Sequence, residues 1–137
     1  MDAAWPKSAG EAIHTSTFLG HPVGCAMALA QIKEIKRLNL CKRSARIGKF
    51  LLDELASIQN SKFKIKSSVH GIGLLAGLEL TLADGSPATE KALRIIKEML
   101  HRGFIFLPEG EHGNVISFTP PLTITEEQLR VAVRALK

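Results

Sequence analysis

The chain has 137 residues, 45% of them hydrophobic and 23% charged, with two cysteines and a net charge of +5. This length leaves room for one domain of ordinary size, and the composition excludes the disordered, charge-dominated class of proteins. No stretch is long and apolar enough to span a membrane, and residues 1–8 lack the regions of a secretory signal. We therefore expect a cytoplasmic protein that does not associate with membranes.

Polar residues and turn formers interrupt residues 1–18, which are predicted to form a loop. Pro22 suits the first position of a helix predicted over residues 22–38, with His21 as its cap. The first half of this helix is apolar on most sides, so we expect it to be buried. A second, amphipathic helix is predicted from Leu40 to about Gln59.

Shorter elements follow in the second half of the chain. We predict strands at 63–67 and 74–80 with a turn at 70–73, turn chemistry at 82–87, a helix at 88–102 ended by Gly103, strands at 104–107 and 114–118, and a closing helix after the capping box at 125–128. This order predicts an α+β fold, with a short, mostly antiparallel sheet and helices on one face. The helix at 22–38 stands apart from that layer, and we infer a missing partner, either another chain or further sequence.

Ten of the eighteen basic residues lie between Lys33 and Lys66. Such a density can mark a nucleic-acid surface. Aromatic residues are sparse there, however, and the charges recur at helical spacing opposite an apolar stripe. We interpret the segment as a solvated helix face and expect no nucleic-acid partner; the alternative predicts binding with a steep salt dependence.

The usual signatures of catalysis are absent from this sequence. The histidines are scattered and no metal-ligand spacing occurs, so we predict no metal site. Cys25 and Cys41 each fall inside a predicted helix without an evident base, and we expect both to be reduced and buried. Thr15-Ser16-Thr17 precedes a helix start, where hydroxyls and N–H groups suit either a phosphate or a simple capping and turn role.

Three motifs, in this order, resemble those of the class III aminotransferases, which are pyridoxal-phosphate enzymes of fold type I. The first is HTSTFLGHP at 14–22, which runs into the helix and resembles the segment before that family's long interdomain helix. The second is HGIGLLAGLEL at 70–80, similar to the glycine-punctuated strand pair of the small domain. The third is FTPPLTITEE at 118–127, similar to the loop that enters the last helix.

The resemblance implies a homodimer in which the Ser16–Thr17 pair lies at the dimer interface and the Thr17 hydroxyl reaches the pyridoxal phosphate held by the other subunit. Residues 1–38 would then end the large domain and form the interdomain helix, and residues 39–137 would form the small carboxyl-terminal domain. Ser117 stands where ornithine-type members place an arginine that clamps a substrate carboxylate. A serine cannot give that bidentate pairing, which argues against an ornithine-like mode.

The family's cofactor-bearing lysine and the acidic partner of the pyridine nitrogen lie upstream of the matched segment. We therefore expect this chain to be the carboxyl-terminal portion of an aminotransferase that moves an amino group between an amine or amino acid and a 2-oxo acid. It would carry no catalytic residue of its own and be inactive alone. The alternatives are a free-standing, non-catalytic interaction module, or a parent enzyme with aminomutase, decarboxylase or epimerase chemistry.

Overall fold

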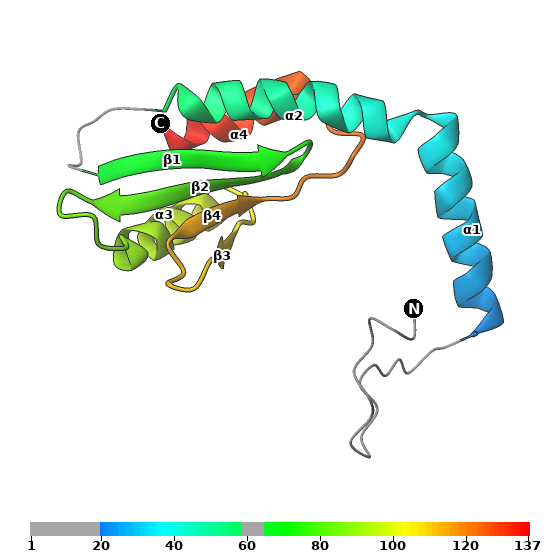
Figure 1. Cartoon of the computed structure of the whole chain (residues 1–137), viewed down its shortest axis with the longest axis horizontal. Helices are drawn as coiled ribbons and strands as arrows, with labels where there is room; N and C mark the ends of the chain where they lie inside the picture. Colours follow the sequence, from blue (N-terminus) through cyan, green and yellow to red (C-terminus); the bar gives the residue numbers. More distant parts are fainter. Residues whose placement is uncertain (1–19, 59–64) are drawn as a thin grey trace, which may run out of the picture. The chain divides into compact units, whose positions relative to one another are not determined.

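The computed structural model describes residues 20–58 and 65–137. The chain divides into two compact units, Met1–Arg37 and Leu38–Lys137, and each is described by itself. The elements, labelled in Figure 1, are α1 (Pro22–Arg37), α2 (Leu40–Ala56), β1 (Ile65–Ile72), β2 (Leu75–Leu82), α3 (Thr89–His101), β3 (Leu107–Glu109), β4 (Val115–Phe118) and α4 (Glu126–Leu136). The roles predicted for residues 1–38 and 39–137 stay predictions.

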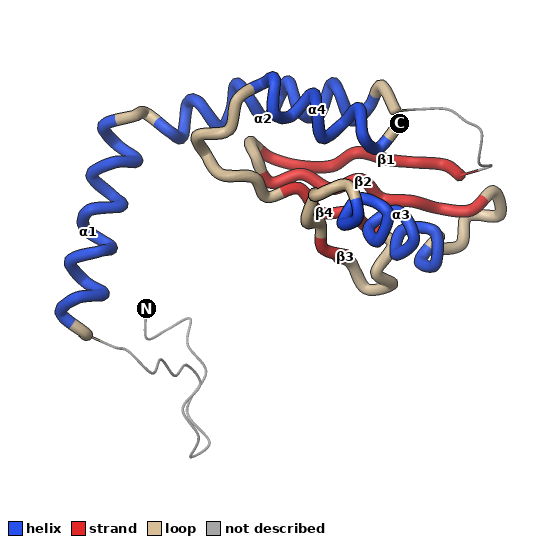
Figure 2. Tube along the Cα trace, turned by 180° about the vertical axis from the view of Figure 1, so that it is seen from behind, coloured by secondary structure: helices blue, strands red, loops and turns tan. Residues whose placement is uncertain are grey.

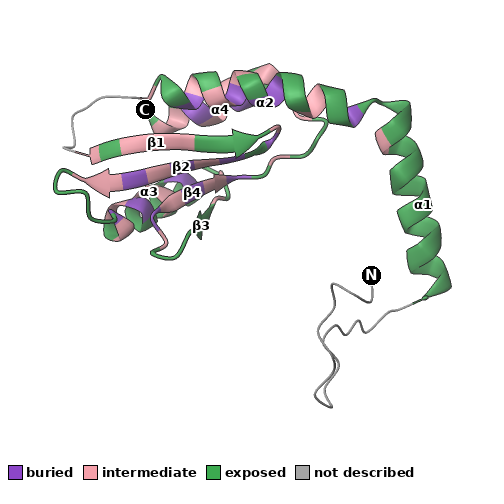
Figure 3. Cartoon of the chain, viewed as in Figure 1, coloured by how far each residue is buried: buried purple, intermediate pink, exposed green. Residues whose placement is uncertain are grey.

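Helix α1 begins as the sequence predicts but is not buried. His21 caps it, because its Nδ1 accepts a hydrogen bond from the Gly24 amide at 3.3 Å. No residue of α1 is buried, and Figure 3 shows the helix exposed along most of its length. The expected burial of its first half is therefore wrong for this chain by itself, because no second layer packs on α1 among the described residues of its unit.

The second unit is an α+β layer, as predicted. Its four strands form one antiparallel sheet in the order β1-β2-β4-β3. Helices α2, α3 and α4 lie together on one face of this sheet (Figures 1 and 2). The core between the helices and the sheet is a single cluster that includes Ile47, Leu51 and Leu55 of α2, Ala76, Leu78 and Leu80 of β2, Ile116 and Phe118 of β4, and Leu129 and Val133 of α4. The apolar stripes of the helices thus meet one side of the sheet.

The hairpin between β1 and β2 is tighter than the sequence indicates. The predicted turn at 70–73 is wrong in position, since β1 continues to Ile72 and pairs it with Leu75. Only Gly73 and Leu74 form the turn, and Gly73 has a φ of +56°, which a glycine adopts without strain. Gly71 is a strand residue: a Cβ there would lie 2.6 Å from the Leu75 carbonyl oxygen. Glycine therefore serves close packing at this position rather than the turn.

Two further predictions need correction. The strand predicted at 104–107 is found at Leu107–Glu109, because only these residues reach hydrogen-bonding register with β4. Cys25 and Cys41 are free thiols, but both are exposed rather than buried. Cys41 lies off the buried stripe of α2, which begins at Leu40 and continues from Ile47, and Cys25 lies on the exposed α1.

The turn chemistry predicted after β2 is confirmed. Asp84 Oδ1 accepts hydrogen bonds from the Ser86 amide at 2.9 Å and from the Ser86 hydroxyl at 2.7 Å. Gly85 between them has a φ of +90°. The two hydrogen bonds favour the ionised carboxylate, so they lower the pKa of Asp84.

The capping box of α4 is present as predicted, and it gives a direct test of local stability. The Gln128 amide donates to Thr125 Oγ1 at 3.2 Å, and the Thr125 amide donates to Gln128 Oε1 at 2.9 Å. We expect Thr125→Ala to lower the free energy of unfolding by about 1 kcal/mol, the usual value of such a cap. Urea denaturation measures this, with Thr123→Ala as the control; equal losses in both variants would contradict the cap's role.

Candidate functional site on the open face of the sheet

The face of the sheet opposite the helices carries the polar residues of the hairpin and of β4. Along β2, Ala76, Leu78 and Leu80 are buried in the core, so Gly77 and Glu79 face the other side. The same alternation turns Ser117 of β4 away from the buried core positions. No described helix of the second unit packs on this face, which we call the open face (Figures 1 and 2).

Strand register brings residues that are far apart in sequence into one row across the open face. His70 pairs with Gly77, Gly77 with Ser117, and Ser117 with Leu107. Gly77 adds no side chain to the middle of the row, and the Val115 side chain packs over it, since a Cβ at Gly77 would lie 2.8 Å from Val115 Cγ1. His70 and Ser117 are therefore the polar side chains on either side of Gly77 in this row.

The row borders a shallow depression of about 590 Å³, the face depression, lined by His70, Gly71, Ile72, Leu75, Ala76, Gly77, Glu109, Ser117 and Thr119. Its lining combines apolar side chains with two hydroxyls, one imidazole and one carboxylate. Neither lysine nor arginine is among the residues that line it. The arrangement can hydrogen-bond a polar group but offers no bidentate partner for a carboxylate.

A cluster of hydrogen bonds adjoins the depression on β1 and β2. His70 Nε2 lies 3.0 Å from Ser68 Oγ and 3.5 Å from Glu79 Oε2. The Ser68 hydroxyl donates to the same Glu79 oxygen at 3.2 Å. In a nucleophilic triad, the two nitrogens of the histidine contact different partners. Here one nitrogen faces both, so the cluster orients His70 and does not activate Ser68.

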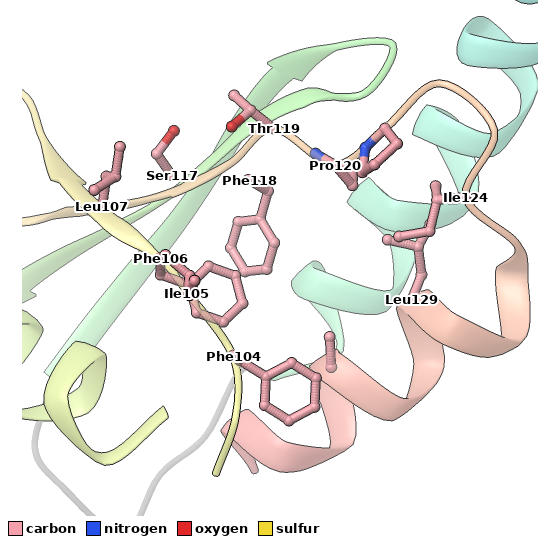
Figure 4. Close-up of a pocket in the computed structure, with 12 residues that line it drawn as sticks. Phe104, Ile105, Phe106, Leu107, Ser117, Phe118, Thr119, Pro120, Ile124 and Leu129 are labelled. Atoms are coloured by element: carbon pink, nitrogen blue, oxygen red, sulfur yellow. The ribbon is translucent and has the colours of Figure 1, made fainter. Parts of the chain in front are cut away.

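A second cavity, of about 360 Å³, lies between β3, β4 and α4 (Figure 4). Its apolar walls include Phe104, Phe106, Phe118 and Leu129. The rings of Phe106 and Phe118 meet edge to face with their centroids 4.8 Å apart. Such a lining holds hydrocarbon groups and supplies no acid or base.

Of the site residues discussed in the sequence analysis, the structure describes Ser117 but not Ser16 or Thr17. Ser16 and Thr17, the predicted phosphate ligands, lie outside the described residues. Ser117 lies on the open face, pairs with Gly77 and lines the face depression. Sequence reasoning missed the row from His70 to Ser117, which strand register sets, and the contribution of Thr119, which the packing around the face depression sets.

Three arginines of the basic segment at residues 33–66 make contacts with other residues of the chain. Arg37 pairs with Glu34, with atoms 2.7 Å apart, and Arg46 pairs with Glu126 at 2.6 Å. The Arg43 guanidinium donates to three carbonyl oxygens of the loop before α4. Within residues 20–58 and 65–137, no cluster of three or more metal-binding side chains occurs, and no helix is long and apolar enough to cross a membrane.

Comparison with known proteins decides the family. The family model for class-III aminotransferases matches residues 1–137 of the chain. The chain belongs to the class-III aminotransferase family. This confirms the resemblance inferred from the three motifs. Enzymes of this family depend on pyridoxal phosphate, as predicted.

Individual relatives span several reactions. The chain is 34% identical to the 5-aminovalerate aminotransferase DavT of Pseudomonas aeruginosa, over 99% of this chain and 31% of that protein. It is 35% identical to the alanine/serine racemase of Pyrococcus horikoshii, over 85% of this chain and 25% of that protein. The crystal structure of a transaminase from the marine bacterium Virgibacillus matches with a TM-score of 0.77 and 32% identity, over 93% of this chain and 30% of that one. The class-III chain thus spans between a quarter and a third of the length of these relatives.

Proposed function

We propose that this chain forms the carboxyl-terminal portion of a pyridoxal-phosphate-dependent aminotransferase that transfers an amino group between an amine or amino acid and a 2-oxo acid. The observation that carries this proposal is the family match over residues 1–137. The share of the relatives that the chain covers, about a third, supports a contribution to a larger catalytic unit. The open face and the exposed α1 are surfaces that such a unit would cover.

The residues of this chain suit a supporting role rather than proton transfer at the reacting carbon. Pyridoxal phosphate, when bound, supplies the electron sink for amino-group transfer. Ser16 and Thr17 would hold its phosphate through charge-assisted hydrogen bonds. The residues lining the face depression include no lysine that could bind the cofactor covalently. Ser117, Thr119 and His70 would instead form a wall that hydrogen-bonds and orients the substrate.

The composition of that wall bears on the substrate. Ser117 occupies the position at which an arginine would bind a carboxylate, and the residues lining the face depression supply no other guanidinium. We therefore propose an amino donor without a carboxylate at that end. Ile72 and Leu75 are exposed and line the face depression, so they favour an apolar or uncharged group there.

The function is tested with the full-length enzyme loaded with pyridoxal phosphate. A panel of primary amines, monocarboxylic amino acids and dicarboxylic amino acids is offered with a 2-oxo acid, and the new amino acid is quantified by chromatography. We expect turnover of amines and monocarboxylic donors. Turnover confined to dicarboxylic donors would contradict the substrate proposal, and no turnover with any donor would contradict the aminotransferase proposal.

Substitution of Thr17 tests the cofactor contact. We expect Thr17→Ala in the full-length enzyme to weaken pyridoxal phosphate retention by about ten- to a hundredfold, because one hydrogen bond to a charged group contributes about 1.5–3 kcal/mol. Thr17→Ser keeps the hydroxyl and is the matched control, expected to retain the cofactor. Equilibrium dialysis followed by cofactor absorbance gives both values, and equal retention in Thr17→Ala and wild type would remove the role of Thr17.

A second candidate reaction is racemisation or epimerisation of an amino acid, favoured by the 35% identity to an alanine/serine racemase. Incubation of single enantiomers without any oxo acid separates the two reactions. Chiral chromatography would show the opposite enantiomer only if the parent enzyme is a racemase. In the same chromatogram, aminomutase chemistry in the parent enzyme would give an isomeric amino acid, and decarboxylase chemistry would give the amine that remains after carbon dioxide is lost.

Assembly and location complete the proposal. We propose a homodimer, which would place the Thr17 hydroxyl at the phosphate held by the other subunit, and a cytoplasmic location. The intact mass of the polypeptide isolated from its source tests the larger unit. A mass several times 14.9 kDa supports it, whereas 14.9 kDa favours the free-standing interaction module instead.

A further inference from the structure

The first turns of α2 hold two segments that border the face depression. The Arg43 guanidinium donates through Nε to the Leu122 carbonyl oxygen at 3.2 Å. Its Nη2 donates to the carbonyl oxygens of Thr123 at 3.1 Å and Ile124 at 2.6 Å. One side chain thus fastens three consecutive peptide groups that lie about 80 residues away in sequence.

The next residue of α2 holds the other segment. Ser44 Oγ accepts a hydrogen bond from the Leu74 amide, in the β1–β2 turn, at 3.1 Å. The turn and the loop therefore share one anchor. They border a small hollow of about 250 Å³ whose lining includes Ser44, Leu74, Thr119 and Leu122.

Thr119 connects this anchor to the candidate site. It lines both the small hollow and the face depression. It also follows β4 directly, two residues after Ser117, and precedes the loop that Arg43 holds. A shift of residues 120–124 would therefore move Thr119 relative to Ser117.

An arginine suits this task better than a lysine. Its planar fork presents several N–H donors at fixed angles, whereas a lysine ammonium is a single point charge on a flexible stem. Arg43 is half-buried against the loop, while Arg46, one turn further along α2, is exposed and pairs with the side chain of Glu126. Leu122 and Thr123 are exposed residues, so water can replace the donors of Arg43 at their carbonyl groups. Loss of Arg43 would then change the position of the loop more than the stability of the fold.

We propose that Arg43 is a positioning residue: it fixes the loop at residues 120–124 and thereby sets the position of Thr119 in the wall that contacts the amino donor. This inference rests on the proposed function. It assigns Arg43 no contact with the substrate or the cofactor. The affinity for the donor therefore depends on a residue of α2 that acts through the loop.

The test uses the full-length enzyme with pyridoxal phosphate and three variants, Arg43→Gln, Arg43→Lys and the control Arg46→Gln. The first readout is hydrogen exchange of the Ile124 amide, which donates to the Pro121 carbonyl oxygen at 2.9 Å. The second is the KM and kcat for the best amino donor. We expect both Arg43 variants to speed the exchange of the Ile124 amide about tenfold. We also expect them to raise KM about tenfold and leave kcat within about twofold, because the lost positioning would weaken binding of the ground state and the transition state equally.

The control variant and the contradicting outcomes distinguish the anchoring role of Arg43 from its effect on the amino donor. Arg46→Gln should leave exchange and KM within about twofold of wild type. Unchanged exchange in Arg43→Gln would overturn the anchor, and faster exchange with unchanged KM would overturn the positioning role. Full rescue by Arg43→Lys would also overturn it, since charge alone would then suffice. No turnover by the wild type would overturn the proposed function and, with it, the effect of Arg43 on the amino donor, while the exchange data would still decide whether Arg43 anchors the loop.

Discussion

Replacing Gly48 with alanine is expected to unfold much of the Leu38–Lys137 unit. Gly48 lies buried on α2 where the helix crosses the β1–β2 turn, and a Cβ there would sit 2.0 Å from the Gly73 carbonyl oxygen and 2.5 Å from the Gly73 Cα. Both are backbone atoms, so no side chain can rotate away. The helix and the hairpin would have to separate, which we expect to lower the free energy of unfolding by about 3 kcal/mol or more.

Urea denaturation of the whole chain, followed by circular dichroism, measures the loss. Gly24→Ala is the matched control, because it is the same substitution within a helix and its nearest neighbours, atoms of His21, lie 3.9 Å away. We expect the control to leave the transition unchanged or to strengthen α1 slightly. A Gly48→Ala midpoint equal to that of the control would show that the helix does not approach the hairpin this closely.

Truncation of Leu51 is expected to give the second largest loss. Leu51 is 0% exposed at the centre of the core cluster, so Leu51→Ala leaves a cavity as well as removing apolar burial. Substitutions of this kind cost about 2–5 kcal/mol. The control is Leu93→Ala on α3, where the leucine is 39% exposed and the expected loss is below about 1 kcal/mol.

The same denaturation series compares the two leucine variants. A loss from Leu51→Ala no larger than that from Leu93→Ala would contradict the single core that joins α2 to the sheet. The result also bears on the candidate site, because α2 carries both the buried stripe and Arg43. If α2 packs less firmly on the core, the loop that Arg43 holds will also be less firmly positioned.

Periodicity and end signals were sufficient to predict most of the elements. The apolar stripe of α2, the capping box at Thr125 and the left-handed Gly103 are local features, since each depends on residues within a few positions of one another. The family could also be inferred from the sequence, because three motifs occur in the expected order. Signals of this kind, which are local or follow a fixed order along the chain, can be recognised without knowledge of the fold.

Glycine was the source of the main local error. The sequence HGIG suggested a turn, but Gly71 belongs to β1, where a Cβ would strike the facing strand. The burial of Cys25 and Cys41 was also misjudged, because a small apolar residue in a helix carries no sign of which face it occupies. Both errors concern what lies across from a residue, and that neighbour is distant in sequence.

The sequence by itself determined the α+β class, the order of the elements and the family, because these follow from short-range patterns. Only the tertiary structure decided that His70, Gly77 and Ser117 form one row, and that Arg43 reaches the carbonyl groups of residues 122–124. The reason is physical: strand register and the direction of a helical side chain are set by packing the whole core at once. A one-residue slip in β2 would have turned Gly77 into the core and broken up the row of residues across the open face.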